Sequence, residues 1–247
     1  MNRASENAVF VQLPLKIGLR DEASFDTFVT EDEATVLALS RFQQSLASRN
    51  RHEAFYLRGE SGVGKTHLLQ AACRFVTEQQ RTSVYVPLND ERLSLIPDVL
   101  NGLETMPLVC LDDVDAIVGE AAWEKALAKL LMRSKELGHQ VVLSGQEPMG
   151  DWRLVTRVLT QALMGVLPIS IQPLHNPQDL VIALQRHSAK LGFKLPLAVG
   201  NYLVRQYSTD LQELLSVLKI LEQATFVEKR RLTLPFVKQT LSRANPA

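Results

Sequence analysis

The sequence has few cysteines, no metal-binding pattern and no long apolar run, and each absence excludes a class of protein. Its two cysteines, Cys73 and Cys110, form no C-x-x-C pair, which argues against a disulfide framework or a zinc site. The five histidines show no ligand spacing either. No apolar run approaches the roughly 18 residues that cross a bilayer, and none resembles a secretory signal. We therefore expect no membrane association and a cytoplasmic protein.

The chain also has no net charge, since 27 basic and 27 acidic residues cancel over 247 residues. A protein that coats nucleic acid or an anionic membrane would carry a basic excess, so any DNA contact is expected to be weak or indirect. Hydrophobic residues make up 46% of the chain, which suits a packed globular core rather than a disordered protein. The length allows one large domain or two unequal ones.

Short apolar runs alternate with amphipathic segments over the first two thirds of the chain. This alternation predicts an α/β fold, with a parallel sheet covered by helices on both faces. Strands are expected at 54–57, 83–86, 108–111, 140–143 and 166–171. Helices are expected at 31–47, 66–79, 93–103 and 123–137.

The last third of the sequence has a different pattern, with helical periodicity and no strand alternation. Asn176-Pro177 is typical of a helix cap followed by proline at the first helical position. Helices are expected at 180–191, 196–206, 210–227 and 235–243. We place a boundary near residues 173–177. The predicted units are an N-terminal tail (1–23), an α/β core (24–174) and an all-helical segment (175–247).

Residues 59–66, Gly-Glu-Ser-Gly-Val-Gly-Lys-Thr, match the phosphate-binding loop G-x-x-x-x-G-K-[ST] at every fixed position. An apolar strand precedes the loop and an amphipathic helix follows it, as the motif requires. Its glycines let successive backbone N–H groups converge on phosphate oxygens, beside the positive end of the helix. Lys65 would reach the β- and γ-phosphates, and the Thr66 hydroxyl would bind Mg²⁺. The expected nucleotide-binding residues are Gly59, Gly62, Val63, Gly64, Lys65 and Thr66.

A second pattern is the apolar strand 108–111, which ends in two carboxylates. In phosphate-loop NTPases an aspartate at such a strand end holds Mg²⁺, which makes Asp112 the metal-binding candidate. Asp113 would orient or deprotonate the attacking water. Ser144, at the end of the next strand, would touch the γ-phosphate or the water, or simply satisfy a turn. No guanine-reading N-K-x-D motif is present, which favours ADP or ATP, with Mg²⁺, as the ligand.

Together the GESGVGKTHLL stretch, the LVCLDDVDAI stretch and the all-helical C-terminal segment resemble AAA+ ATPases of the bacterial replication initiator (DnaA) clade. Within that clade the sequence is most similar to the Hda family of regulatory inactivators. The ending at 232–238 is similar to that family's terminus, and the chain stops after the helices without an appended DNA-binding domain. The resemblance implies a five-stranded AAA+ core with a small all-α C-terminal lid.

The resemblance also implies two partner-binding elements. The family's N-terminal peptide docks on the DNA polymerase sliding clamp, so Gln12, Leu13 and Leu15 are expected to bind that clamp as an extended peptide. The family also places an L-x-S-R-type segment whose arginine reaches a neighbouring subunit's nucleotide as an arginine finger. The segment 154–157 is similar, which makes Arg157 the candidate finger, with Arg153 as the alternative.

The lid departs from the clade's pattern. Gln212 stands where the clade carries an arginine that touches the nucleotide, and an amide supplies no positive charge. Vigorous self-hydrolysis is therefore not expected, and at most a weak ATPase is predicted. The apolar face of helix 66–79, together with His67, is interpreted as packing.

The resemblance implies a nucleotide-bound regulator of replication initiation. Such a protein links the sliding clamp to the initiator DnaA and promotes hydrolysis of the initiator's ATP, with self-association into a homo-oligomer left open. The alternative is an autonomous AAA+ ATPase, such as a helicase loader or a DNA-dependent motor. A small-molecule kinase ranks last, because no acid or arginine cluster arranged for an acceptor is evident.

Overall fold

The computed structural model describes residues 23–48 and 52–244, and its centre is a five-stranded parallel sheet. The strand order is β2-β3-β4-β1-β5. The strands are β1 (Ala54–Arg58), β2 (Ser83–Pro87), β3 (Leu108–Asp112), β4 (Gln140–Gly145) and β5 (Val166–Ser170). Every pairing within the sheet is parallel, so the carboxyl ends of all five strands lie at one edge. The parallel sheet predicted from the apolar runs is confirmed.

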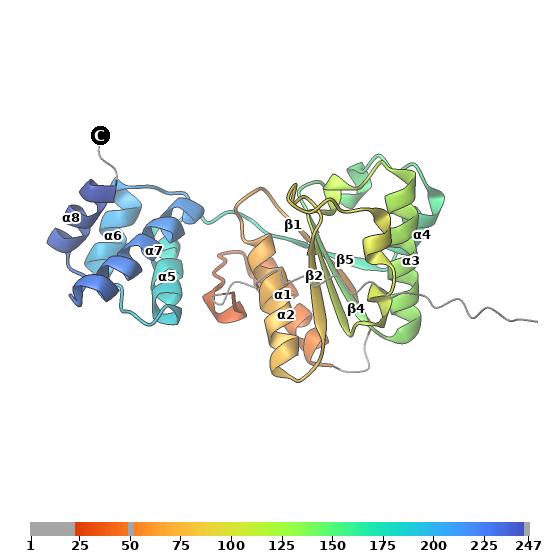
Figure 1. The fold of residues 1–247 in the computed structure, drawn as a ribbon, viewed down its shortest axis with the longest axis horizontal. Coiled ribbons are helices and arrows are strands. Elements are labelled where there is room, and N and C mark those ends of the chain that lie inside the picture. The colour runs from red at the N-terminus through yellow and green to blue at the C-terminus, as the bar shows by residue number, and fades with distance from the viewer. Residues whose placement is uncertain (1–22, 49–51, 245–247) are drawn as a thin grey trace, which may run out of the picture.

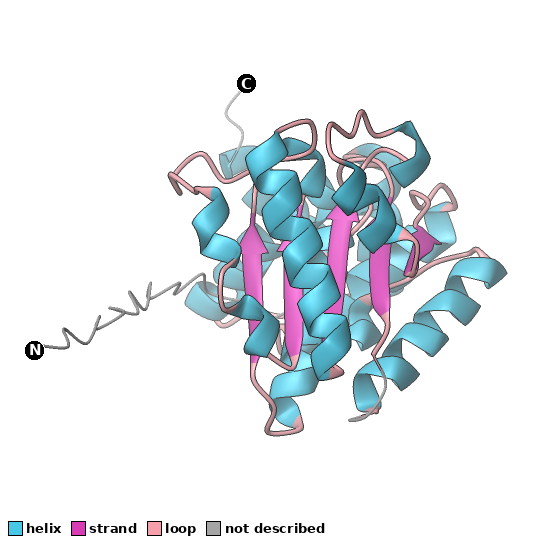
Figure 2. Ribbon diagram, turned by 90° about the vertical axis from the view of Figure 1, so that its right-hand side faces the viewer, coloured by secondary structure: helices cyan, strands magenta, loops and turns pink. Residues whose placement is uncertain are grey.

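Helices cover both faces of the sheet, as Figures 1 and 2 show. The helices of this part are α1 (Glu33–Ala47), α2 (Lys65–Glu78), α3 (Ala121–Leu137) and α4 (Arg157–Leu163). Because successive strand residues point to opposite faces, each strand contributes to two apolar cores. Leu108 and Cys110 pack in the core under α1 and α2, whereas Val109 and Leu111 pack in the core under α3.

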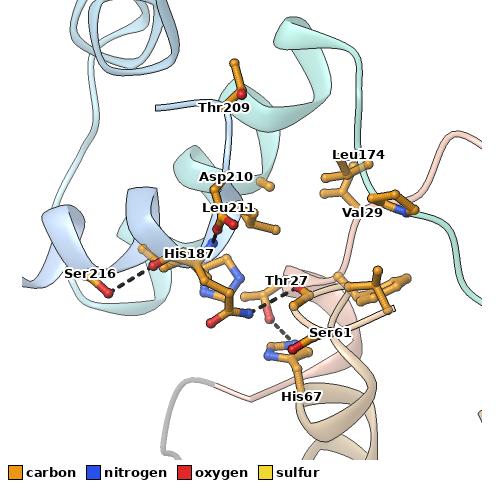
Figure 3. A pocket seen from close by; sticks show the side chains of 18 of the residues that line it. Thr27, Val29, Ser61, His67, Leu174, His187, Thr209, Asp210, Leu211 and Ser216 are labelled. Carbon is orange, nitrogen blue, oxygen red and sulfur yellow. Dashed lines mark hydrogen bonds between the residues drawn. The ribbon is translucent and has the colours of Figure 1, made fainter. Parts of the chain in front are cut away.

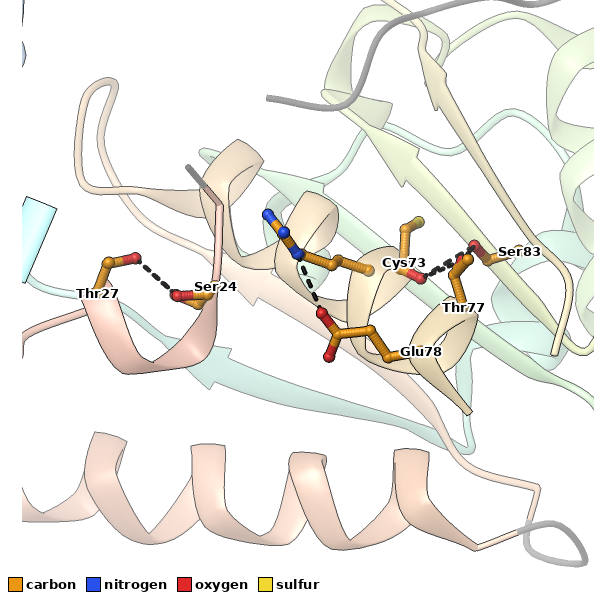
Figure 4. A network of polar contacts seen from close by, with 7 residues as sticks. Ser24, Thr27, Cys73, Thr77, Glu78 and Ser83 are labelled. Carbon is orange, nitrogen blue, oxygen red and sulfur yellow. Dashed lines mark hydrogen bonds and ion pairs between the residues drawn. The ribbon is translucent and has the colours of Figure 1, made fainter. Parts of the chain in front are cut away.

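The end of α2 is tied to the start of β2 by side-chain hydrogen bonds (Figure 4). The hydroxyls of Thr77 and Ser83 both donate to the carbonyl oxygen of Cys73, over 2.8 and 3.3 Å. Cys73 and Cys110 are free, buried thiols, as the sequence predicts. These bonds fix the helix that starts at the phosphate loop against the sheet.

The segment 93–103 is not the α-helix that the sequence predicts. It contains the short 3₁₀ turn Pro97–Leu100, and a second one follows at Leu103–Thr105. Pro97 has no N–H to donate within a helix, and Gly102 adopts a left-handed φ of 84°. A helical pattern of apolar residues is therefore interrupted twice by the backbone. The short helix α4, in contrast, was not predicted.

The C-terminal part is a four-helix unit with its own apolar core, set to one side of the sheet in Figure 1. Its helices are α5 (Pro177–Lys190), α6 (Leu197–Gln206), α7 (Leu211–Glu228) and α8 (Leu234–Ala244). As predicted, Asn176 caps α5, with its side chain accepting from the N–H of Gln178 and Pro177 at the first turn. Arg186 of α5 donates to the carbonyl oxygens of Asp26 and Phe28, which ties this unit to the N-terminal segment of the core.

No helix in the described part of the chain is long and apolar enough to cross a membrane. The predicted clamp-binding residues Gln12, Leu13 and Leu15 lie outside the described residues.

Candidate functional site

The loop at 59–64 connects β1 to α2, and its glycines are required by geometry. Gly62 and Gly64 have φ angles of 85° and 102°, which side chains with a Cβ rarely adopt. A Cβ on Gly59 would lie 2.4 Å from the carbonyl oxygen of Ile171, so no larger residue fits there. The loop delivers the chain directly into α2, whose first turn leaves backbone N–H groups without helical partners. This is the cradle that an anionic phosphate chain needs.

Lys65 lies folded onto this loop. Its Nζ donates to the carbonyl oxygens of Gly59 and Glu60, over 2.7 and 2.8 Å, and the side chain is buried. Burial lowers the pKa of Lys65, and the charges of three nearby carboxylates offset part of that decrease. The carboxylates are Asp113, Asp112 and Asp115. The sequence-predicted lysine and acidic strand end are thus close enough to interact.

Asp112 is the last residue of β3, and its buried carboxylate is held on both sides. The hydroxyl of Tyr85 donates to Oδ2 over 2.7 Å, and the hydroxyl of Ser144 donates to Oδ1. The Ser144 hydroxyl also accepts from the N–H of Asp113 over 3.0 Å, and Ser144 is fully buried. Both hydrogen-bonding functions of Ser144 are therefore used within the protein. This geometry supports the turn-satisfying role considered for Ser144 over direct contact with a phosphate.

Asp113 has a different environment from its neighbour. It adopts a left-handed φ of 56° at the start of the 3₁₀ turn Val114–Ala116, and its side chain does not cap that turn. Burial raises the pKa of Asp113, and so does the charge of Asp112, while Lys65 lowers it. A carboxylate with a raised pKa and a partly exposed position is suited to accept a proton from water.

A cavity of about 570 Å³ lies between the phosphate loop and the C-terminal helices (Figure 3). The loop forms one wall from Glu60 to Gly64, and residues 27–29 of the N-terminal segment form another. Residues of α5 and α7 close the third side. The side-chain amide of Gln212 donates to the carbonyl oxygen of Gly62 over 3.3 Å, so the position considered for nucleotide sensing faces the loop. Gln212 is positioned by Asp210, which caps α7.

The cavity wall includes residues that sequence reasoning did not assign. The sequence predicts a packing role for His67 of α2, and the structure also places it in the cavity wall, where its Nε2 lies 2.9 Å from the carbonyl oxygen of Ser24. Its ring meets the ring of His187 from α5 edge to face, with 5.5 Å between centroids. Burial lowers the pKa of His187 to about 4, with smaller contributions from His67 and Lys219. Lys219 of α7 also lines the cavity, so the lid brings a cation there despite the neutral Gln212.

The two candidate arginines lie elsewhere. Arg157 is the first residue of α4, and Arg153 is in the preceding loop; both side chains are exposed. Neither is among the described residues that line the cavity. Both arginines therefore lie on the surface of the protein, outside the cavity.

Comparison with known families decides the identity of the fold. Residues 19–167 match the model of the bacterial DnaA ATPase domain, which is more than half of the chain. The chain belongs to the bacterial DnaA ATPase family. Residues 178–241 match the model of the Hda lid domain, so this DnaA-related AAA+ protein is Hda-like. These matches confirm the resemblance drawn from the motifs and support a place among regulators of replication initiation.

Solved structures of low identity share the fold. Domain III of the replication initiation protein DnaA from Thermotoga maritima has a TM-score of 0.70 at 18% identity, covering 91% of this chain and 98% of that one. AMPPCP-bound DnaA from Aquifex aeolicus has a TM-score of 0.63 at 18% identity, covering 83% and 66%. The Holliday junction branch migration motor RuvB from Thermotoga maritima has a TM-score of 0.61 at 14% identity, covering 92% and 74%. The AAA+ fold with a helical lid is thereby confirmed.

Proposed function

We propose that this DnaA-family protein is a nucleotide-bound regulator of replication initiation. It holds an adenine nucleotide, tethers itself to the polymerase sliding clamp, and promotes hydrolysis of the ATP bound to the initiator DnaA. The observation that carries the proposal is that the cavity and the candidate arginine finger lie at different places on the molecule. The phosphate loop and the lid enclose one cavity, while the exposed Arg157 lies outside it.

The phosphate loop and the residues beside it fit an adenine nucleotide with Mg²⁺. The Gly59–Lys65 loop and the start of α2 offer backbone donors for the phosphates, and Lys65 is close by. Thr66 and Asp112 would hold Mg²⁺, which binds through one or two protein ligands and phosphate oxygens and keeps several waters. The related DnaA from Aquifex aeolicus was solved with AMPPCP bound, which supports an adenine nucleotide here.

In this proposal the nucleotide that the protein itself binds has a structural role and is hydrolysed only slowly. Gln212 contacts the phosphate loop with a neutral amide, so the lid position facing Gly62 adds no positive charge to the phosphates. The bound nucleotide joins the core to the lid across the cavity. Asp113, with its raised pKa, would orient or deprotonate water in the weak hydrolysis that remains.

Arg157 is the proposed group that acts on the partner. An arginine finger neutralises charge on the transferring phosphoryl group and is worth about 10³–10⁵-fold in rate in related enzymes. Its exposure at the start of α4 suits insertion into the nucleotide site of a bound DnaA molecule. Gln12, Leu13 and Leu15 would dock on the clamp, which raises the local concentration of the regulator near replicating DNA.

The test measures hydrolysis of initiator-bound ATP in the presence of clamp loaded on DNA. Arg157→Ala should abolish the stimulation and leave clamp binding intact, and Arg153→Ala should leave both unchanged. Paired Gln12→Ala and Leu13→Ala changes should abolish clamp pull-down. Clamp pull-down that survives those changes would remove the tether from the proposal. An autonomous motor, in contrast, would hydrolyse ATP rapidly alone or on DNA without any initiator.

A further inference from the structure

A buried carboxylate on α3 organises the loop that precedes Arg157. Glu124 is 1% exposed, and its two carboxylate oxygens accept from four donors. The N–H of Gly119 lies 3.1 Å from Oε1, and the N–H of Val155 lies 2.9 Å from the same atom. Oε2 accepts from the N–H and the hydroxyl of Thr156, over 2.7 and 2.6 Å.

These hydrogen bonds keep Glu124 ionised. Burial alone would raise the pKa of Glu124, but the donors at 156, 155 and 119 outweigh it, and the net pKa is lowered. A buried carboxylate of this kind is stable only while its donors remain in place. The loop and the carboxylate therefore fix one another.

The loop that Glu124 holds leads directly into α4, whose first residue is Arg157. Thr156 is the N-terminal cap residue of α4, yet its side chain makes no capping bond to that helix. It donates instead to Glu124, 32 positions earlier in the chain. Glu124 of α3 thus fixes the backbone at residues 155 and 156, which come directly before Arg157 in the chain.

We propose that Glu124 is a positioning residue for the Arg157 guanidinium, through its hold on Val155 and Thr156. The proposal rests on the proposed function, in which Arg157 acts on the ATP of a bound initiator. A misplacement of about 1 Å at a reacting centre can cost on the order of 10²-fold in rate. A carboxylate that pins two consecutive N–H groups restricts such displacement at the base of the arginine.

Glu124→Gln is the discriminating variant because it keeps the shape and removes the charge. One oxygen becomes an NH₂ group that faces N–H donors and cannot accept from them. We expect the maximal rate of stimulated hydrolysis to fall at least about tenfold. The concentration of the protein that gives half of the maximal stimulation should change little, since the buried Glu124 side chain offers no surface for docking.

Three further variants separate positioning from general stability. Glu120→Gln removes an exposed acid four residues away, at the start of the same helix, and should behave as wild type. Thr156→Val removes only the hydroxyl donor and should give a smaller loss than Glu124→Gln, which keeps the test open if the glutamine variant folds poorly. Thr156→Ser retains a hydroxyl and should restore the rate.

The outcomes distinguish this inference from the proposed function. If Arg157→Ala abolishes stimulation and both Glu124→Gln and Thr156→Val keep the full maximal rate, the positioning role is overturned and the proposed function stands. If Arg157→Ala leaves stimulation intact, the proposed function fails first and the positioning role fails with it.

Discussion

The side-chain amide of Gln212, on the second residue of α7, donates a hydrogen bond to the carbonyl oxygen of Gly62 in the phosphate loop. The lid therefore meets the loop at the point where Gly62 adopts its left-handed backbone, and it does so with a neutral group. Whatever occupies the cavity lies beside this contact, because both residues line the cavity wall.

Replacing Gln212 with arginine should strengthen the lid's interaction with a nucleotide triphosphate. A hydrogen bond to a charged group is worth about 1.5–3 kcal/mol, and the exposure of this position reduces that gain. We expect Gln212→Arg to tighten ATP binding about tenfold, with a smaller effect on ADP, as measured by isothermal titration calorimetry. Gln206→Arg, at an exposed site on α6 away from the cavity, is the matched control. Equal ATP affinity in both variants would show that Gln212 does not face the phosphates.

Removal of the Lys65 ammonium should weaken nucleotide binding strongly without unfolding the protein. Lys65 bonds to two loop carbonyl oxygens and lies next to the acidic strand end, so its charge offsets both the phosphates and the carboxylates. We expect Lys65→Ala to weaken ADP binding at least about 100-fold, since hydrogen bonds between charged groups are the strong ones. Lys129→Ala, an exposed change on α3, should bind ADP like wild type. Unimpaired ADP binding by Lys65→Ala would contradict the nucleotide site.

Stability should fall as the pH drops from neutral toward 4, and His187 should account for part of that fall. Its folded-state pKa is lowered to about 4, whereas a histidine in the unfolded chain titrates near 6.5. Between these values the unfolded state binds the extra proton, so the free energy of unfolding rises with pH by up to about 1.4 kcal/mol per unit. His67 and Lys219 face the same ring and disfavour its protonation.

Urea unfolding at several pH values between 4 and 7 tests this contribution. His187→Gln should flatten the dependence of the unfolding free energy on pH in that window. His175→Gln changes an exposed histidine of the same cavity and should leave the wild-type slope. An unchanged slope for His187→Gln would mean that the buried ring does not contribute to the pH dependence of the unfolding free energy.

The hydroxyl of Tyr85 should stabilise the buried carboxylate of Asp112 in the absence of ligand. Hydrogen bonds to charged groups contribute about 1.5–3 kcal/mol, and a buried carboxylate that loses a donor is destabilised. We expect Tyr85→Phe to lower the free energy of unfolding by about 1.5–3 kcal/mol. Saturating ADP with Mg²⁺ should recover part of the loss, because a cation would replace the missing donor. Tyr202→Phe, which keeps the ring that lies under Lys238, is the control.

Much of the sheet could be predicted because its pattern is local. Strands that are buried on both faces appear as uninterrupted apolar runs, and 108–111 is a clear case. The same reasoning gave the wrong structure at 93–103, where apolar spacing suggested a helix and Pro97 and Gly102 prevented one. Local propensity also gave no indication of α4, a seven-residue helix that begins in a loop held by Glu124 from another element.

The candidate site was predictable only where a motif encodes it. The positions of Lys65, Asp112 and the glycines of the phosphate loop follow from motif spacing. The residues that the lid contributes to the cavity do not. Gln212 meets Gly62 across 150 positions, and His187 meets the ring of His67 across a shorter but still long separation. Ser144 illustrates the same limit. Its place at a strand end was evident, whereas the direction of its hydroxyl toward Asp112 depends on how β3 and β4 lie side by side.

Because Gly59 has no side chain, the start of the phosphate loop is in direct contact with the backbone of the segment that leads from β5 to the lid. The carbonyl oxygen of Ile171 occupies the space beside that glycine, and the N–H of Ile171 donates to the carbonyl oxygen of Arg58 over 2.7 Å. Ile171 also begins the stem that carries the chain from β5 to α5. A side chain at position 59 would therefore displace the backbone of the segment that leads to the lid as well as the phosphate loop.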